Sequence, residues 1–572
     1  MNRNLVTRLL LLLIPVLAAG LFLRTFYTPD EPREASLTVA MATQANHALP
    51  ELAGETFAEK PPLLYWLGGA VVASVGPSPA STRLPNLFYG LLAALSLALI
   101  ARRAAGLAAG VVTGVVTVTA LQLYDVLIWL ATDAPLVAGV SVALAGMYAG
   151  LTTEVVSARR RGYVVLAVGL LVAFFAKGPA GWMVPGFAFV TVLTLEGRWR
   201  ELRRPEPWIV VPVVGLGIGA WVWAVLARPD GLESLKVLFF YNTLGRALAI
   251  QAPASYAYAT GHLNSPGKYL IELPIYLLPW TALALVAFVR GFKRLRQAGA
   301  TGTAWRLAYG AIVPATVLLS LAATARGVYY GPPLLGFALM VGLEFADSAR
   351  LDEPARGAAF GWTRVLVAGL AILVGAMALL LTLAPATRDT AHMVLAAVTF
   401  AATAYAVQRA WRAHGSRERV LRDFSFSVCV TLAFVAAPIW IGLNPLVSLE
   451  STANDIEIAA AGHPLVLLDP DETTQAMSEL YLGHLPSRAI DARDGGGETR
   501  YLWLVQDHYR WKAAQWLTRL GYQHRAITVV SPPVTPPSHT SIEALIERAG
   551  GRRYAILKAK PMAVSAPVTQ TP

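Results

Sequence analysis

Long apolar runs, separated by short clusters of arginine and lysine, fill this 572-residue chain as far as about residue 442. A helix needs about 20 largely apolar residues to cross a bilayer. The runs reach that length repeatedly, and only 14% of the residues are charged, whereas soluble proteins carry roughly 25%. The sequence therefore predicts a polytopic α-helical membrane protein.

We expect about thirteen membrane-spanning helices, one for each apolar run of sufficient length. The predicted spans are residues 9–27, 81–101, 107–124, 129–150, 163–176, 180–195, 207–226, 270–289, 307–324, 328–345, 363–384, 390–408 and 423–442. The first is interpreted as an uncleaved span, because its apolar residues continue beyond the small residues at 18–20 to Leu23. The fifth is short for a complete crossing.

Six basic clusters follow alternate predicted spans and fall on the same side of the membrane as the N-terminus. They are Arg102 and Arg103; Arg159, Arg160 and Arg161; Arg198, Arg200, Arg203 and Arg204; Arg290, Lys293, Arg294 and Arg296; Arg350 and Arg356; and Arg409, Arg412, Arg417, Arg419 and Arg422. The positive-inside rule makes this side cytoplasmic. Loops 28–80 and 227–269, and everything after 443, are then expected on the outer side. The net charge of +12 reflects topology rather than nucleic-acid binding.

The C-terminal part has a different character from the apolar region. We expect a transmembrane domain over 1–444, a small α/β domain over 445–560 and a disordered tail over 561–572. The predicted strands are 465–468, 501–505, 527–530 and 554–557, and the predicted helices are 471–482 and 508–520.

The first outer loop begins with an acidic segment directly after the first span. Asp30 and Glu34 are four residues apart and would share one helix face, where carboxylates could accept a proton or bind a metal. The alternative is a well-formed helix start, in which Thr28 is the N-cap and Glu31 completes a capping box. Residues alone leave both interpretations open.

A second segment of this loop reads Glu59-Lys60-Pro61-Pro62-Leu63-Leu64-Tyr65-Trp66. It could be an interfacial helix with Tyr65 and Trp66 as headgroup-level anchors and Lys60 directed to the interface. Alternatively, Lys60 could bind a lipid phosphate, for which a compact ammonium is well suited. The sequence contains neither a Walker-type loop nor a Rossmann fingerprint, so we expect no nucleotide cofactor.

These motifs together resemble the bacterial membrane glycosyltransferases of the C-type fold (GT-C). The resemblance is strongest to the aminoarabinose transferases that modify lipid A, within the protein O-mannosyltransferase superfamily. It is carried by Asp30-Glu31, by the segment 59–66 and by Thr82-Arg83-Leu84-Pro85. Weaker similarities occur, in order, at Thr132-Asp133-Ala134-Pro135-Leu136, Lys177-Gly178-Pro179, Gly261-His262, Leu278-Pro279-Trp280 and Arg326-Gly327-Val328-Tyr329-Tyr330.

The resemblance implies an inverting transfer of a sugar from undecaprenyl phosphate, on the outer leaflet of the bacterial inner membrane, to an envelope acceptor. The sugar that it implies first is 4-amino-4-deoxy-L-arabinose or a related sugar, and the acceptor is a lipid A phosphate. It implies a periplasmic active site with Asp30, Glu31 and Asp133 as catalytic acids. Lys60, Arg83, Lys177 and Arg326 would bind the donor phosphate. Fixed cations would stabilise the negative charge that grows on this leaving group.

A divalent metal bound by Glu59 and His262 is a further implication of the resemblance. From the residues alone, a lone histidine is more often a local hydrogen-bonding residue. Likewise Lys177, at a span end, could simply reach the interface, and Tyr329 and Tyr330 are expected in the interfacial aromatic belt.

Two other functions stay open at this point. The Pro-Pro-Leu-Leu motif is common to relatives with other substrates, so a polyprenyl-phosphate-mannose-type transferase acting on protein or glycan hydroxyls is one alternative. A lipid or sugar transporter or flippase is another. A transporter usually has repeated halves and polar residues at mid-membrane. The acids of this chain lie at span ends instead, which favours chemistry at the membrane surface.

Overall fold

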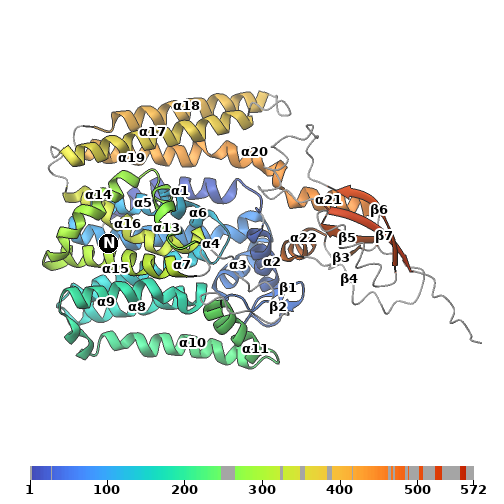
Figure 1. Ribbon diagram of the computed structural model, residues 1–572, viewed down its shortest axis with the longest axis horizontal. Coiled ribbons are helices and arrows are strands. Elements are labelled where there is room, and N and C mark those ends of the chain that lie inside the picture. Colours follow the sequence, from blue (N-terminus) through green and yellow to red (C-terminus); the bar gives the residue numbers. More distant parts are fainter. Residues whose placement is uncertain are drawn as a thin grey trace, which may run out of the picture. The chain divides into compact units, whose positions relative to one another are not determined.

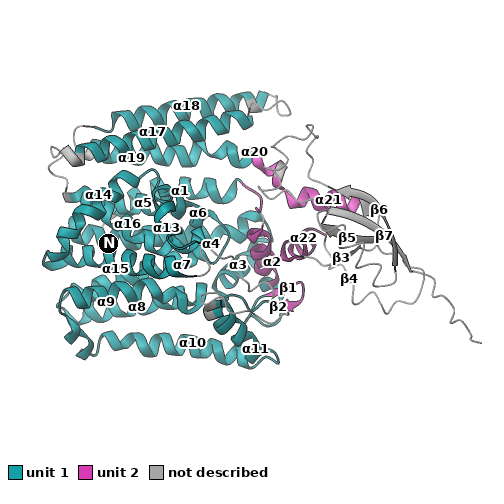
Figure 2. Ribbon diagram, in the orientation of Figure 1, with its two compact units in different colours: residues 1–23, 41–50, 56–441 teal, residues 24–40, 51–55, 442–572 magenta. Residues whose placement is uncertain are grey.

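The computed structural model describes most of the chain as helices, many of which lie side by side (Figure 1). The described residues are 3–27, 29–245, 265–322, 326–347, 354–382, 390–414, 417–460, 465–467, 471–482, 487–488, 502–506, 522–530 and 554–561. They form two compact units, coloured separately in Figure 2. The first unit comprises residues 1–23, 41–50 and 56–441, and the second comprises 24–40, 51–55 and 442–572.

The first unit contains the apolar helices. In its N-terminal half they are α1 (Arg3–Phe22), α3 (Leu63–Val75), α4 (Pro79–Ala105), α5 (Leu107–Thr119), α6 (Leu121–Ile128), α7 (Asp133–Leu151), α8 (Val156–Lys177), α9 (Met183–Leu195), α10 (Val210–Leu226) and α11 (Gly231–Lys236). The C-terminal half has α13 (Lys268–Tyr276), α14 (Thr281–Gly291), α15 (Gly299–Leu321), α16 (Gly331–Asp347), α17 (Pro354–Thr382), α18 (Thr390–Arg412), α19 (Arg417–Val430) and α20 (Ala437–Val447). Short helical turns include η1 (Gly178–Trp182), the π-helix η4 (Val237–Gly245) and η7 (Gly327–Tyr330).

The predicted multi-pass architecture is confirmed, with a difference in the number of spans. Among the described residues, 10 helical segments are long and apolar enough to cross a membrane, or up to 11 if the bent pair α5 and α6 counts as one span. That pair bends by 65° at Ala120, within predicted span 107–124. Predicted spans 163–176 and 180–195 fall within one 40-residue segment, Val156–Leu195. Predicted span 270–289 is divided between α13 and α14, both shorter than a complete crossing.

The prediction that the fifth span is too short is wrong. Helix α8 has 22 residues, because its first turns contain Arg159, Arg160 and Arg161. These arginines interrupt the apolar run in the sequence but not the helix, since the long side chains at a helix start can reach water. Arg159 is itself paired with Glu206 at 3.1 Å.

Close packing of α7 against α8 fixes the core of the first unit. A Cβ added to Gly146 of α7 would lie 2.3 Å from the backbone nitrogen of Leu166 and 2.7 Å from the carbonyl oxygen of Gly162, both on α8. Gly139 and Gly169 make similarly close approaches to the partner helix. Small residues at such spacings let two membrane helices approach to backbone contact.

We therefore expect Gly146→Ala to destabilise the protein by about 1–3 kcal/mol through overpacking. Gly186→Ala on α9 and Gly219→Ala on α10 are matched controls, because a Cβ at either position meets nothing within 4 Å. Thermal unfolding in detergent, followed by tryptophan fluorescence, measures the difference. An unchanged unfolding midpoint for Gly146→Ala would contradict this packing.

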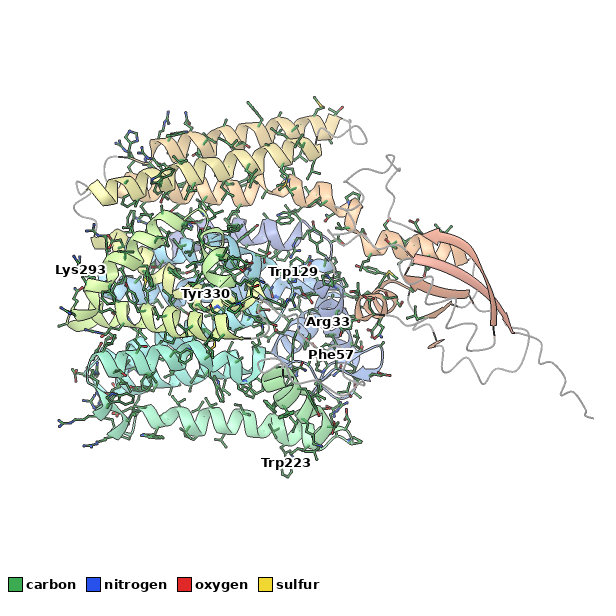
Figure 3. The ribbon with its side chains drawn as sticks, viewed as in Figure 1. Arg33, Phe57, Trp129, Trp223, Lys293 and Tyr330 are labelled. Carbon is green, nitrogen blue, oxygen red and sulfur yellow. The ribbon has the colours of Figure 1, made fainter. Side chains whose placement is uncertain are left out.

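The two ends of the helical bundle differ in the residues that they carry. Figure 3 shows Lys293 at one end of the first unit and Phe57 and Trp129 at the other. Lys293 belongs to the basic turn that follows α14. The candidate site described below lies at the opposite end, where α7 begins and α8 ends.

The second unit combines the first part of α2 (Asp30–Thr43) with the C-terminal region. Strands β3 (Leu465–Leu467), β4 (Ser487–Arg488), β5 (Leu502–Gln506), β6 (Tyr522–Val530) and β7 (Tyr554–Pro561) form a sheet of order β4-β3-β5-β7-β6. β3 is parallel to β4 and β5, whereas β7 is antiparallel to β5 and β6. Helices α21 (Leu449–Ala460) and α22 (Glu472–Tyr481) accompany it, and a short pair, β1 (Glu51–Leu52) with β2 (Glu55–Thr56), lies in the first loop.

An α/β region therefore follows the spans, as predicted. The predicted helix 508–520 lies outside the described residues, and so does the predicted tail after Pro561. The expected domain boundary at 445 lies close to the start of the C-terminal segment of the second unit at residue 442. That unit also takes in residues 24–40 and 51–55, which the sequence had assigned to the transmembrane domain.

Candidate active site

A cavity of about 210 Å³ lies in the first unit, where α3 and α7 begin and α8 ends. Its walls are largely apolar and come from α7, α9, η4 and α15. Its polar lining residues are Glu59, Lys60, Lys177, Asn242 and Tyr329. A mostly apolar cavity with a few convergent polar groups is the usual form of a ligand site.

Lys177 forms an ion pair with Asp133, and the local fold explains why they meet. Asp133 is the first residue of α7 and Lys177 is the last of α8. The helices are consecutive and packed together, so the start of one lies beside the end of the other. A helix dipole favours a negative charge at the N-terminus, where Asp133 lies on α7, and a positive charge at the C-terminus, where Lys177 lies on α8. Asp133 is 7% exposed, and its Oδ1 accepts a hydrogen bond from the Lys177 ammonium.

The ammonium of Lys177 also lies over an aromatic ring. Its Nζ is 4.4 Å from the ring centre of Tyr329, which belongs to η7 between α15 and α16. Tyr329 is thus a wall of the cavity, a role that the sequence did not predict. The expectation that Tyr330 lies in an interfacial belt is wrong, because Tyr330 is completely buried and stacks on Tyr269 at 5.0 Å between ring centres.

Lys60 and Glu59 enter the cavity from the segment just before α3. Lys60 is half-buried and Glu59 is buried. Pro61 and Pro62 then lead into the helix, whose first backbone bond runs from the Trp66 N–H to the Pro62 carbonyl at 2.8 Å. The alternative role of Tyr65 as a headgroup anchor is excluded by its 0% exposure.

Asn242 is a lining residue that sequence reasoning missed. It lies on the π-helix η4, and both polar atoms of its side-chain amide are buried without a hydrogen-bond partner among the described residues. A buried unsatisfied amide is costly and is often explained by a ligand or an ordered water. Nothing in the local sequence distinguishes Asn242 from a surface asparagine.

Two of the four predicted phosphate-binding residues do not line this cavity. Arg83 is 0% exposed within α4, and its Nη1 donates to the carbonyl oxygen of Leu21 at 3.4 Å. Arg326 is exposed at the start of η7, and its carbonyl oxygen accepts a hydrogen bond from the Tyr269 hydroxyl at 3.0 Å. The cavity thus brings together Lys60, Lys177 and, through its ion pair, Asp133.

In the second unit, Glu31 forms a buried ion pair with Arg24. Two bonds run from the guanidinium to the two carboxylate oxygens at 2.8 and 2.9 Å, and both residues are at most 3% exposed. The N–H of Tyr27 also donates to Glu31 at 2.9 Å, which resembles the expected capping interaction. The predicted N-cap, Thr28, lies outside the described residues.

Asp30 is held within the same unit by Arg33, which the sequence did not single out. The Nη2 of Arg33 contacts Asp30 at 3.1 Å and Glu34 at 2.9 Å, so the two acids share a helix face as predicted. The Nη1 of Arg33 donates to Glu472 on α22. The end of α2 that carries Asp30 is thus joined to the C-terminal region.

A second connection between α2 and α22 runs through Glu479. Its carboxylate accepts a hydrogen bond from the Ser36 hydroxyl and one from the Ala53 N–H at 3.4 Å. Burial raises the pKa of Glu479 above its ordinary value.

The proposed metal ligands are only partly described. Glu59 lines the cavity, but His262 lies outside the described residues. Within those residues, no group of three or more histidine, cysteine, aspartate or glutamate side chains could hold a metal ion. The metal site stays a prediction.

Comparison with known proteins supports the resemblance predicted from the motifs. Residues 59–223 match the family model described as dolichyl-phosphate-mannose-protein mannosyltransferase. The chain is 25% identical over 375 residues to undecaprenyl phosphate-alpha-4-amino-4-deoxy-L-arabinose arabinosyl transferase 2 of Pseudomonas fluorescens, covering 64% of this chain and 63% of the relative. It is 24% identical over 368 residues to the corresponding transferase of Pseudomonas aeruginosa, covering 63% and 62%.

A solved structure extends the likeness to nearly the whole chain. The crystal structure of ArnT from Cupriavidus metallidurans bound to undecaprenyl phosphate superposes with a TM-score of 0.71 at 17% identity, covering 97% of this chain and 98% of that one. The predicted GT-C fold is therefore confirmed. The sequence matches to the curated relatives, in contrast, span less than two thirds of those proteins' length.

Proposed function

We propose that this chain, which has the C-type glycosyltransferase fold, transfers a sugar from a polyprenyl phosphate to an acceptor of the bacterial envelope. The preferred donor is undecaprenyl phosphate-linked 4-amino-4-deoxy-L-arabinose, and the preferred acceptor is a lipid A phosphate. The names of the two Pseudomonas relatives support this donor. The protein would lie in the inner membrane, with the basic helix ends cytoplasmic and the cavity periplasmic.

The observation that carries the proposal is the presence of two lysines in one largely apolar cavity at a helix end. Lys60 and Lys177 come from different helices and line the same space. A prenyl phosphate fits such a cavity, because its compact anion can contact the lysines while its apolar chain contacts the apolar walls.

The transfer requires one bond to break and one to form at the anomeric carbon of the sugar. The bond from this carbon to the phosphate oxygen breaks, and the polyprenyl phosphate leaves with the electron pair. An acceptor oxygen attacks from the opposite face, which inverts the anomeric configuration. Lys60 and Lys177 would stabilise the charge that develops on the phosphate, because fixed cations act strongly in a site with little water.

Asp133 would act through Lys177 as a positioning residue, since its carboxylate holds the ammonium in place. Asn242 offers an amide that could bind a sugar hydroxyl or a phosphate oxygen. Asp30 would face the acceptor: a lipid A phosphate is already an anion and needs positioning, whereas a hydroxyl acceptor needs Asp30 as a base.

Replacement of Asp30 by Asn is expected to lower sugar transfer at least about 100-fold while the protein folds normally. Mass spectrometry of lipid A and envelope glycans, from cells with and without the protein and with each variant, measures the product. Asp455→Asn on α21 serves as a control in the same unit. Unchanged transfer by Asp30→Asn would rule out the assigned role.

The family model favours a second candidate, a polyprenyl-phosphate-mannose-type transferase acting on protein or glycan hydroxyls, because its description names a mannosyltransferase. The same mass spectra separate the two. A hexose on glycans or proteins, with lipid A unchanged, would support the second candidate over the first.

A further inference from the structure

A second cavity lies at the opposite end of the first unit, between α4, α7 and α8, and has a volume of about 570 Å³. Its lining includes Arg103 at the end of α4, Arg161 near the start of α8 and Ala300 at the start of α15. The Thr301 hydroxyl donates to the Ala104 carbonyl oxygen at 2.7 Å, which ties the start of α15 to the end of α4. The cavity thus lies at the basic end of the bundle.

The two arginines that line this cavity differ from other arginines at this end. Arg159 of α8, which does not line the cavity, pairs with Glu206 at 3.1 Å. Arg306 of α15 pairs with Glu196 at 2.8 Å. Arg103 and Arg161 are exposed and form no ion pair with any part of the chain that the structure describes. Two uncompensated positive charges therefore border one cavity.

A tyrosine whose hydroxyl is buried without a hydrogen-bond partner among the described residues also lines this cavity. Tyr148 of α7 lines the cavity and is 1% exposed, and its hydroxyl group has no hydrogen-bond partner among the described residues. Ala158, another lining residue, lies in the first turn of the 22-residue helix α8, where backbone N–H groups and the helix dipole favour an anion. Both features are independent of the arginines and favour the same type of ligand.

The remaining lining is mostly apolar, with Thr152 and Thr153 as its other polar residues. Leu99 and Ile100 of α4 and Val165 of α8 line the side of the cavity away from the helix ends, and Val165 is 42% exposed. A free phosphate would leave these apolar surfaces uncovered. A phospholipid would place its phosphate by the arginines and the first part of its acyl chains against the apolar walls.

We propose that this cavity binds the phosphate headgroup of an anionic phospholipid from the membrane leaflet on the basic side. Basic pockets between membrane helices on the cytoplasmic side are suited to such headgroups. The site is separate from the cavity that Lys60 and Lys177 line at the other end of the unit, the lysine cavity. It does not depend on which sugar the protein transfers or on whether transfer occurs.

The test uses the full-length protein in nanodiscs of phosphatidylcholine, with or without phosphatidylglycerol. Phosphatidylglycerol is expected to raise the thermal unfolding midpoint of the wild type and to remain bound in native mass spectrometry. The double variant Arg103→Gln/Arg161→Gln is expected to bind the anionic lipid about 30-fold more weakly. This factor follows because each arginine near an anionic lipid usually contributes a similar binding free energy, and two such contributions are lost. Tyr148→Phe should weaken binding by a smaller factor.

The matched control is Arg102→Gln/Arg160→Gln, which removes the same charge from the same two helix ends but from residues outside the cavity lining. This control should retain the bound lipid and the shift in midpoint. Equal loss in both double variants would mean general surface attraction and would overturn the proposal. The proposal would also be overturned if inorganic phosphate alone stabilised the wild type as much as phosphatidylglycerol does. The same holds if phosphatidylglycerol stabilised the Arg103→Gln/Arg161→Gln variant as much as the wild type.

Discussion

Replacement of Lys177 by Gln is expected to lower sugar transfer about 100- to 1000-fold, the usual cost of removing one fixed group that stabilises transition-state charge. Lys60→Gln should have an effect of the same order, because both lysines line the cavity. Transfer can be measured with purified protein, a lipid-linked donor and an acceptor, with mass spectrometry of the product. Lys236→Gln is the control, since Lys236 is exposed and pairs with Glu233 at 3.1 Å outside the cavity.

Lys177 could instead serve only to hold the ends of α7 and α8 together. Lys177→Gln would then act by leaving Asp133, which is 7% exposed, without its ion pair. The double variant Asp133→Asn/Lys177→Gln replaces the pair with two neutral groups that can hydrogen-bond to each other. We expect it to unfold at nearly the wild-type temperature and to remain inactive. Recovery of transfer in the double variant would show that the pair is structural only.

The sequence singled out Lys177 and Asp133 through their resemblance to family motifs, and Lys177 also through its place at the end of an apolar run. It did not predict their pairing, which depends on the close packing of α7 against α8. A signal for this packing was present: Gly139 and Gly146 on one helix, and Gly162 and Gly169 on the other, each recur after seven residues. Small residues at such intervals indicate a helix contact in a membrane.

Other parts of the site could not be predicted from the chain alone. Arg33 contacts Glu472, which is 439 residues away in the sequence, and no local pattern reveals such a contact. Arg83 matched a family motif, but its side chain is enclosed within the bundle rather than in the lysine cavity. The motif that contains Arg83 did not indicate the direction of its side chain, which depends on the packing of distant helices.

The buried pair of Arg24 and Glu31 leads to the largest expected effect on stability. Both residues are nearly inaccessible, at 3% and 0% exposure, and two hydrogen bonds join them. Removing one partner of a buried ion pair leaves an uncompensated charge, which usually costs about 3–5 kcal/mol. We therefore expect Arg24→Met to lower the free energy of unfolding by about this amount, as measured by denaturant or thermal unfolding in detergent.

The double variant Arg24→Met/Glu31→Met separates a structural role of Glu31 from the catalytic role expected from the sequence. Replacement of both charges by apolar groups of similar volume is often close to neutral for stability. Because the two carboxylate oxygens of Glu31 already accept bonds from Arg24, and one also from the Tyr27 N–H, we expect Glu31 to position α2 rather than to touch the substrate. The double variant should regain both stability and most of the transfer activity, unlike Asp30→Asn. A stable but inactive double variant would instead return Glu31 to the catalytic group.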